Sequence, residues 1–286
     1  EVSMTARLHV ACVQMTSARE PCPNIKAASA HVRDAHDAGA QLIMLPEVVN
    51  MVEAFGPLVL ERAHVEAEDP FLAAMRALAR KTGVWLLVGS IILKSDRPSA
   101  ETRSEDSKEI LVNRSLLIDA EGVIVARYDK IHMFDVDLED GESYRESKSY
   151  QPGVAAVVAE TPWGTLGMTV CYDLRFPHLY RTLAHRGASY LAIPSAFTQT
   201  TGAAHWHVLM RARAIENGCF VFAPAQCGVH ESGRKTYGHS LIVDPWGRVL
   251  ADGGKVPGII SAEINPAEIK NARGRIPSLT HDRLFD

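Results

Sequence analysis

LHVACVQMTSAREPCPNIKAASAHVRDAHDAGAQLIMLPE, residues 8–47, contains a complete strand–helix–strand unit. The apolar run at residues 8–14 predicts a buried strand. Residues 24–40 predict a helix with Asn24 as its N-cap, and residues 41–47 predict a second strand. This order of elements is typical of an α/β fold, in which helices cover a largely parallel sheet.

The alternation of strands and helices continues along the chain. Residues 71–83 predict a helix that ends at Gly83, and residues 84–93 predict a buried strand. The turn at residues 120–122 predicts a hairpin. Residues 165–226 then repeat the order of strand, helix, strand, helix and strand. The two halves therefore hint at an internal repeat, with one large core and the helices outside.

Composition limits the class of protein. The 286 residues carry a formal net charge of −4, and Lys and Arg form no basic block, which argues against a nucleic-acid partner. No run approaches the ~18 consecutive apolar residues of a membrane span, so we expect no membrane partner. Because no linker rich in Pro, Gly or Ser divides the chain, we expect one domain over residues 4–286. Residues 1–3, ahead of Met4, are interpreted as an expression remnant.

The cysteines indicate a reducing compartment. Their odd number, irregular spacing and lack of a CxxC pair predict free thiols in a cytoplasmic protein: Cys12, Cys22, Cys171, Cys219 and Cys227. Four of them are interpreted as small buried or loop residues. Cys171 differs, because it ends an apolar strand directly before a helix that Pro177 opens.

Three reactive side chains stand where predicted strands stop: Glu47, Lys130 and Cys171. Ligands usually bind at the carboxyl ends of strands in α/β folds, so we expect these side chains to gather. A Cys at such a turn is expected to be exposed, near amide N–H donors, with a thiolate that an ammonium can stabilise. Taken singly, each residue also has an ordinary interpretation as a buried Cys, a capping carboxylate or a surface Lys.

The segments around these residues, LPEVVN, YDKIHMF and GMTVCYDLRFP, resemble the nitrilase superfamily of carbon–nitrogen hydrolases. The strings AHWHVLMRARAIEN, FAPAQCG and YGHSLIVDPWG extend the resemblance over essentially the whole chain. It implies a four-layer αββα sandwich and a Glu-Lys-Cys triad, whose roles fall on Glu47, Lys130 and Cys171. It also implies a second glutamate after the lysine, which matches Glu146 in SYRES, with Glu142 in the same loop as the alternative.

The resemblance implies hydrolysis of a small carboxamide without a cofactor. Cys171 would form a thioester, and Glu47 would move protons for both half-reactions. Lys130 and the backbone N–H of Tyr172 would stabilise the oxyanion, and Glu146 would orient Lys130 or the substrate.

A second group of residues is assigned to substrate binding. Phe197, Thr198 and His205 lie at a loop–helix junction that forms part of the pocket in relatives, and Tyr172 follows the nucleophile. Asp173 and Arg175 could bind substrate as well, but an ion pair that fixes the turn after Cys171 is the preferred interpretation.

No metal site is expected from the sequence. His205 and His207 would point to different faces of a helix, and no HExxH or Cys/His finger spacing occurs. The GxSxG turn of serine hydrolases and the Gly-rich phosphate loops are also missing from the sequence.

Within the superfamily, the Nit branch with its deaminated-glutathione amidases fits best. Two departures bear on specificity, since many relatives have Pro at the position of Ala203 and Glu at that of His207. The alternatives are an ω-amidase acting on 2-oxoglutaramate, an N-carbamoyl amino-acid amidohydrolase, and a catalytically silent binding protein. A homodimer or a dimer of dimers is expected, paired through the helix of Trp206 and the C-terminal segment from Ile276.

Overall fold

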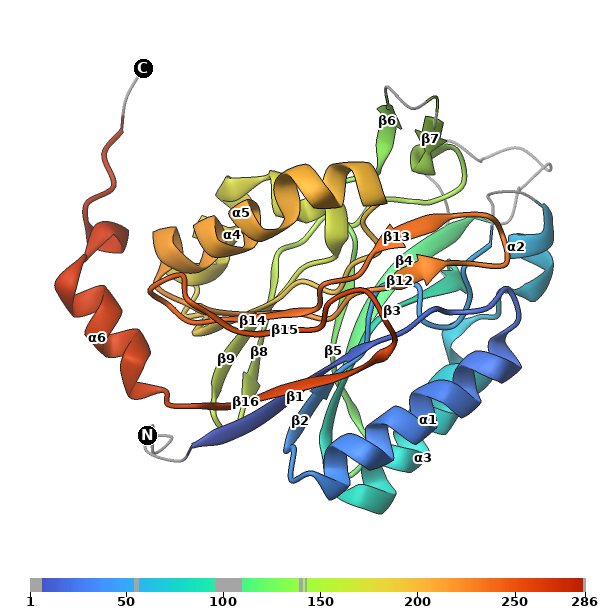
Figure 1. The fold of residues 1–286 in the computed structure, drawn as a ribbon, viewed down its shortest axis with the longest axis horizontal. Coiled ribbons are helices and arrows are strands. Elements are labelled where there is room, and N and C mark those ends of the chain that lie inside the picture. Colours follow the sequence, from blue (N-terminus) through green and yellow to red (C-terminus); the bar gives the residue numbers. More distant parts are fainter. Residues whose placement is uncertain (1–6, 54–56, 96–109, 139–140, 142, 285–286) are drawn as a thin grey trace.

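The computed structural model describes residues 7–53, 57–95, 110–138, 141 and 143–284. Two six-stranded sheets face each other across the middle of the molecule (Figure 1). The first sheet has the strand order β16 (Gly258–Ile264), β1 (Leu8–Gln14), β2 (Leu42–Met44), β3 (Trp85–Lys94), β4 (Leu111–Ile118) and β5 (Ile124–Asp129). The second has the order β15 (Val249–Asp252), β14 (Leu241–Val243), β11 (Phe220–Ala223), β10 (Tyr190–Ala192), β9 (Gly164–Met168) and β8 (Val157–Thr161).

Helices cover the outer face of each sheet. The first sheet is covered by α1 (Pro21–Asp37) and α3 (Pro70–Thr82), and the second by α4 (Pro177–His185) and α5 (Gln199–Asn217). This arrangement confirms the αββα sandwich. Two further helices, α2 (Pro57–Arg62) and α6 (Ala267–Arg275), lie at the periphery (Figure 1). None of the helices that the structure describes is both long and apolar enough to cross a bilayer.

The two sheets share one pairing pattern. In the first sheet β1, β2 and β3 pair in parallel, and β4 pairs with β3 in the antiparallel sense. In the second sheet β9, β10 and β11 pair in parallel, and β14 is antiparallel to β11. The internal repeat that the sequence hinted at is therefore a repeat of strand topology in the two halves of the chain.

The core is divided rather than single, contrary to the sequence expectation. Alternate residues of β1 face opposite sides of the sheet, because side chains alternate along a strand. Val10 and Cys12 pack between the two sheets, whereas Ala11 and Val13 pack under α1 and α3. Both faces of the sheet are buried there, so residues 10–13 form a continuous apolar run.

Local boundaries agree with the sequence in part. Gly83 ends α3 in the left-handed conformation at φ 74°, and β4 and β5 form the predicted hairpin. The predicted N-cap of α1 is wrong. The helix begins at Pro21 with Glu20 as N-cap, because proline is tolerated in the first turn. The Asn24 amide instead bonds the backbone of Ala18 and Asn50.

Several strands were not predicted from the sequence. They are β8, β16, and the two small hairpins β6 (Asp135–Asp137) with β7 (Ser143–Arg145) and β12 (Cys227–Val229) with β13 (Lys235–Tyr237).

The two sheets approach closely at Gly89 in β3. A Cβ atom there would lie 1.9 Å from the carbonyl oxygen of Leu45 and 2.6 Å from the Cβ atom of Pro194. Only glycine permits this contact. This close approach packs the turn that leads to Glu47 against the turn that follows β10. It therefore helps to position Glu47.

Candidate active site

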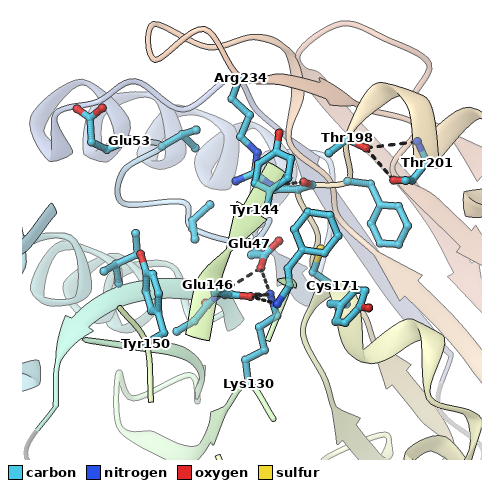
Figure 2. A pocket seen from close by; sticks show the side chains of 18 of the residues that line it. Glu47, Glu53, Lys130, Tyr144, Glu146, Tyr150, Cys171, Thr198, Thr201 and Arg234 are labelled. Carbon is cyan, nitrogen blue, oxygen red and sulfur yellow. Dashed lines mark hydrogen bonds and ion pairs between the residues drawn. The ribbon is translucent and has the colours of Figure 1, made fainter. Parts of the chain in front are cut away.

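Four residues from four separate segments line one pocket between the sheets (Figure 2). Glu47 follows β2 and Lys130 follows β5. Cys171 begins the short 3₁₀ helix η3 (Cys171–Arg175) after β9, and Glu146 begins the 3₁₀ helix η2 (Glu146–Lys148) after β7. All four side chains are buried. The structure thus brings together Glu47, Lys130 and Cys171, which were expected to gather, and places Glu146 beside them.

Lys130 lies between two carboxylates. Its Nζ atom is 3.1 Å from Oε1 of Glu47, and 3.0 and 2.8 Å from the two oxygens of Glu146. Burial alone would lower the pKa of the lysine, but the negative charges of Glu146 and Glu47 outweigh it and raise the pKa. Lys130 is therefore a charged ammonium, which suits an oxyanion stabiliser better than a base.

Glu47 uses its two carboxylate oxygens differently. Oε1 accepts hydrogen bonds from Lys130 and from Nδ2 of Asn113, at 3.0 Å for Asn113. Oε2 is buried and has no hydrogen-bond partner among the described residues. Burial raises the pKa of the Glu47 carboxyl, but the charges of Lys130 and Arg234 outweigh burial, and the pKa is lowered overall. An ionised carboxylate with one unpaired oxygen is equipped to accept a proton.

The turn that carries Glu47 is fixed by its backbone. Val48 has a left-handed φ of 47°, which is uncommon for a β-branched residue. Its N–H donates to Oγ of Ser90 at 2.9 Å, and the carbonyl of Glu47 accepts from Nε2 of Gln226 at 3.0 Å. These bonds hold a strained turn in one orientation.

Glu146 is tied to the lysine and to the backbone. Besides contacting Lys130 with both oxygens, its Oε2 accepts the N–H of Phe134 at 2.7 Å. Asn113 donates to Oε1 at 3.4 Å, so Asn113 bridges the two glutamates. The alternative candidate, Glu142, lies outside the described residues.

Cys171 is not exposed, contrary to the sequence expectation, since its relative exposure is 7%. Its backbone has a left-handed φ of 50°, and its N–H donates to the carbonyl of Pro194 at 2.9 Å. Burial and the charge of Glu47 raise the pKa of the thiol, and the charge of Lys130 only partly offsets this. The resting side chain is a thiol, so attack requires a base, and the interacting carboxyl is that of Glu47.

The predicted substrate-binding residues divide into two groups. Tyr172, Phe197 and Thr198 line the pocket. Thr198 is also the N-cap of α5, where its hydroxyl accepts the N–H of Thr201. His205 is not among the lining residues, and its Nδ1 atom lies 3.2 Å from Nη1 of Arg175.

The ion pair predicted between Asp173 and Arg175 does not form, so that interpretation is wrong. Asp173 is fully buried and accepts hydrogen bonds from the hydroxyl of Tyr128 at 2.6 Å and the N–H of Val170 at 2.9 Å, with a ring nitrogen of His132 at 2.7 Å. It fixes the turn from the interior. Arg175 instead faces the pocket, with its guanidinium 5.5 Å from the ring centre of Phe197.

Other lining residues were not predicted from the sequence. They include the apolar Val48, Met51, Val52 and Ile92, the aromatic Phe134, Tyr144 and Tyr150, and the polar Glu53, Asn113, Thr201 and Arg234. Asn113 had a weak signal as a polar residue inside an apolar strand. Arg234 had none, because it lies in a polar turn before β13.

The chain is similar to known proteins in both sequence and fold. The carbon–nitrogen hydrolase family model matches residues 9–274. A deaminated glutathione amidase of Yersinia enterocolitica is 40% identical over 279 residues, which cover 96% of this chain and 93% of the relative. A deaminated glutathione amidase of Synechocystis is 42% identical over 281 residues, covering 96% and 97%.

Solved structures of the superfamily have the same fold. The Caenorhabditis elegans NitFhit protein superposes with a TM-score of 0.88 at 36% identity, over 98% of this chain and 66% of that chain. Saccharomyces cerevisiae Nit3, a member of branch 10 of the nitrilase superfamily, has a TM-score of 0.82 at 27% identity, with 96% of each chain covered.

Proposed function

Because this chain belongs to the carbon–nitrogen hydrolase family, we propose that it is an amidase with deaminated glutathione as its substrate. Two relatives at 40% and 42% identity carry that name over nearly their full length. The catalytic part rests on the buried carboxylate of Glu47, which interacts with the protonated thiol of Cys171.

In the first half-reaction, Glu47 accepts the Cys171 proton as Sγ attacks the amide carbonyl carbon. The carbonyl oxygen takes up the electron pair, and the ammonium of Lys130 and the N–H of Tyr172 stabilise its charge. Collapse of the adduct breaks the carbon–nitrogen bond, and Glu47 returns the proton to the departing amine. A thioester and a free amine result.

In the second half-reaction, water takes the place of the amine. Glu47 removes a proton from the water, the oxygen attacks the thioester, and the carbon–sulfur bond breaks. The proton returns to Sγ, which restores the thiol. Glu146 keeps Lys130 in place through both steps, since it contacts Nζ with both of its oxygens.

The positive side chains of the pocket favour an acyl group with a carboxylate. Arg175 and Arg234 both line the pocket. Arg234 donates to the carbonyl of Ala196 at 2.6 Å, while its Nε is buried without a hydrogen-bond partner among the described residues. A guanidinium with a spare donor suits a carboxylate ligand. Figure 2 shows Arg234 beside Tyr144 on the Glu47 side of the pocket. We therefore assign Arg234 to the carboxylate of a 2-oxo acid half.

A substrate panel tests the proposal. Deaminated glutathione should give 2-oxoglutarate and a dipeptide amine, with a kcat/KM at least tenfold above those for 2-oxoglutaramate, N-carbamoyl amino acids and simple nitriles. A preference for 2-oxoglutaramate with ammonia release would assign the ω-amidase function instead. Cys171→Ala removes the thiol with little change in volume, so it should abolish turnover and leave the thermal transition unchanged.

A catalytically silent binding protein makes a different prediction. It would take up one label at Cys171 and release no amine from any amide in the panel.

Arg234→Met tests the carboxylate contact. Loss of a charge-assisted hydrogen bond worth ~1.5–3 kcal/mol should raise KM for deaminated glutathione by roughly 10–150-fold. The KM for an amide without a carboxylate should stay the same. An equal rise for both amides would assign Arg234 to the shape of the pocket and not to the substrate.

We also propose a homodimer or dimer of dimers in the cytoplasm, where a catalytic thiol stays reduced. Trp206 cannot serve as an interface anchor, because it is buried and donates to the carbonyl of His239 at 2.7 Å. Val208 and Ile215 of α5 are exposed and supply apolar surface, as does Ile276 near the C-terminus. Light scattering should give a dimer or tetramer mass, and Val208→Asp should lower it.

A further inference from the structure

A cluster of three potential metal ligands lies outside the pocket. His207 comes from α5, His239 from the connection between β13 and β14, and Asp252 from the end of β15. One potential ligand atom from each lies within 4.8 Å of the others. None of the three lines the pocket around Cys171. This cluster could not be predicted from the sequence, because the three residues lie far apart along the chain.

The carboxylate of Asp252 lies at the centre of the cluster. Nε2 of His207 is 2.9 Å from its Oδ2, and Nδ1 of His239 is 2.8 Å from its Oδ1. The N–H of Gly254 also donates to Oδ1 at 2.9 Å, so three donors hold the carboxylate in one orientation.

The surroundings of His239 hold its ring in place. Its backbone has a left-handed φ of 54°, its N–H donates to the carbonyl of Gly254 at 2.6 Å, and its carbonyl accepts from Trp206. The ring of Tyr237 stacks on the imidazole with centroids 4.6 Å apart. Such support from surrounding groups orients metal ligands and raises affinity.

We propose that His207, His239 and Asp252 bind one divalent transition-metal ion such as Zn²⁺, with water completing the coordination. Two imidazoles and one carboxylate are a donor set that suits Zn²⁺, Co²⁺ and Ni²⁺ better than Mg²⁺ or Ca²⁺. Bonds of ~2.0–2.1 Å at a tetrahedral ion place neighbouring ligand atoms about 3.3 Å apart. The separations of 2.8 and 2.9 Å run to different oxygens of Asp252 and would open by about half an ångström, and the ligand atoms of all three residues already lie within 4.8 Å of one another. Both histidines are half-buried and Asp252 is exposed, so an ion can enter.

The metal would brace the pocket wall without touching the reacting atoms. His207 lies on α5, whose N-cap Thr198 and first-turn residue Thr201 line the pocket. His239 follows β13, which begins directly after Arg234. Binding would join these segments and stabilise the folded chain, whichever amide is hydrolysed at Cys171.

The experiment measures metal stoichiometry in tag-free protein with the Cys22→Ser and Cys171→Ala changes, which remove competing thiols. Isothermal titration should give one Zn²⁺ or Co²⁺ per chain with a Kd on the order of 1 μM, and no detectable Mg²⁺ binding. At Zn²⁺ concentrations 100 times Kd, Tm should rise by roughly 3 °C or more. Less than 0.2 ion per chain at ~100 μM Zn²⁺, about 100 times that Kd, would overturn the proposal.

Matched variants identify the ligands. His207→Gln can still donate to Asp252, and Asp252→Asn can still accept the N–H of Gly254, so both should fold and weaken Zn²⁺ binding by roughly 100-fold. His36→Gln changes an exposed His–Asp pair elsewhere and should leave binding intact. Unchanged affinity in both ligand variants would reduce the cluster to hydrogen bonds on Asp252.

Discussion

Replacing Glu47 with Gln distinguishes the roles of its two carboxylate oxygens. The amide oxygen of Gln can keep both hydrogen bonds that Oε1 accepts, from Lys130 at 3.1 Å and Asn113 at 3.0 Å. The amide nitrogen then occupies the position of Oε2, the oxygen that has no hydrogen-bond partner among the described residues. Lys130 keeps two contacts with Glu146, so its charge is not left unpaired. The variant should fold, with only the proton acceptor removed.

The expected loss follows from the proton transfers that Glu47 makes. In each half-reaction Glu47 takes up a proton and gives it back. General acid–base help contributes ~10²–10⁴-fold, so acylation and thioester hydrolysis should each slow by that factor. Single-turnover mixing followed by intact mass spectrometry measures the thioester adduct directly. A Glu47→Gln enzyme that acylates at the wild-type rate would refute the assignment of Glu47 as the base.

Glu146→Gln serves as the comparison. Both oxygens of Glu146 accept, from Lys130 and from the N–H of Phe134, so the new NH₂ group must face a donor. Lys130 should shift, and a misplacement of ~1 Å can cost ~10²-fold, which is the lower end of the loss expected for Glu47→Gln. Full activity would give Glu146 an ordinary structural role and make Glu142 the next candidate.

Three further predictions concern the fold, metals and pH. Gly89→Ala should destabilise the chain by roughly 3 kcal/mol in urea unfolding, because the new Cβ meets backbone atoms, whereas Gly258→Ala has open space and should change little. Turnover should survive EDTA, since nucleophile, base and oxyanion stabiliser belong to the chain; activity that only Zn²⁺ restores would contradict this. Because the pKa of Glu47 is lowered from 4.5, the acid limb of kcat/KM should lie below pH 4.5, and a limb at pH 6–7 would count against it.

The sequence by itself determined the strand ends at which Glu47, Lys130 and Cys171 stand. It also determined the end of α3 at Gly83 and the hairpin of β4 and β5. These features depend on nearby residues, because apolar periodicity, turn residues and helix caps act over a few positions. The resemblance added the roles of the triad and of Glu146.

Only the tertiary structure decided how distant segments meet. Strand β16, near the end of the chain, pairs with β1 at its start in the first sheet. The alternation of strands and helices predicted one core, but the two sheets divide the buried apolar residues into separate clusters. Burial of Cys171, burial of the Glu47 carboxylate and the position of Arg234 in the pocket have the same origin. Each depends on contacts between segments far apart in the chain, whose pairing is set by packing of the whole molecule, and local periodicity carries no information about it.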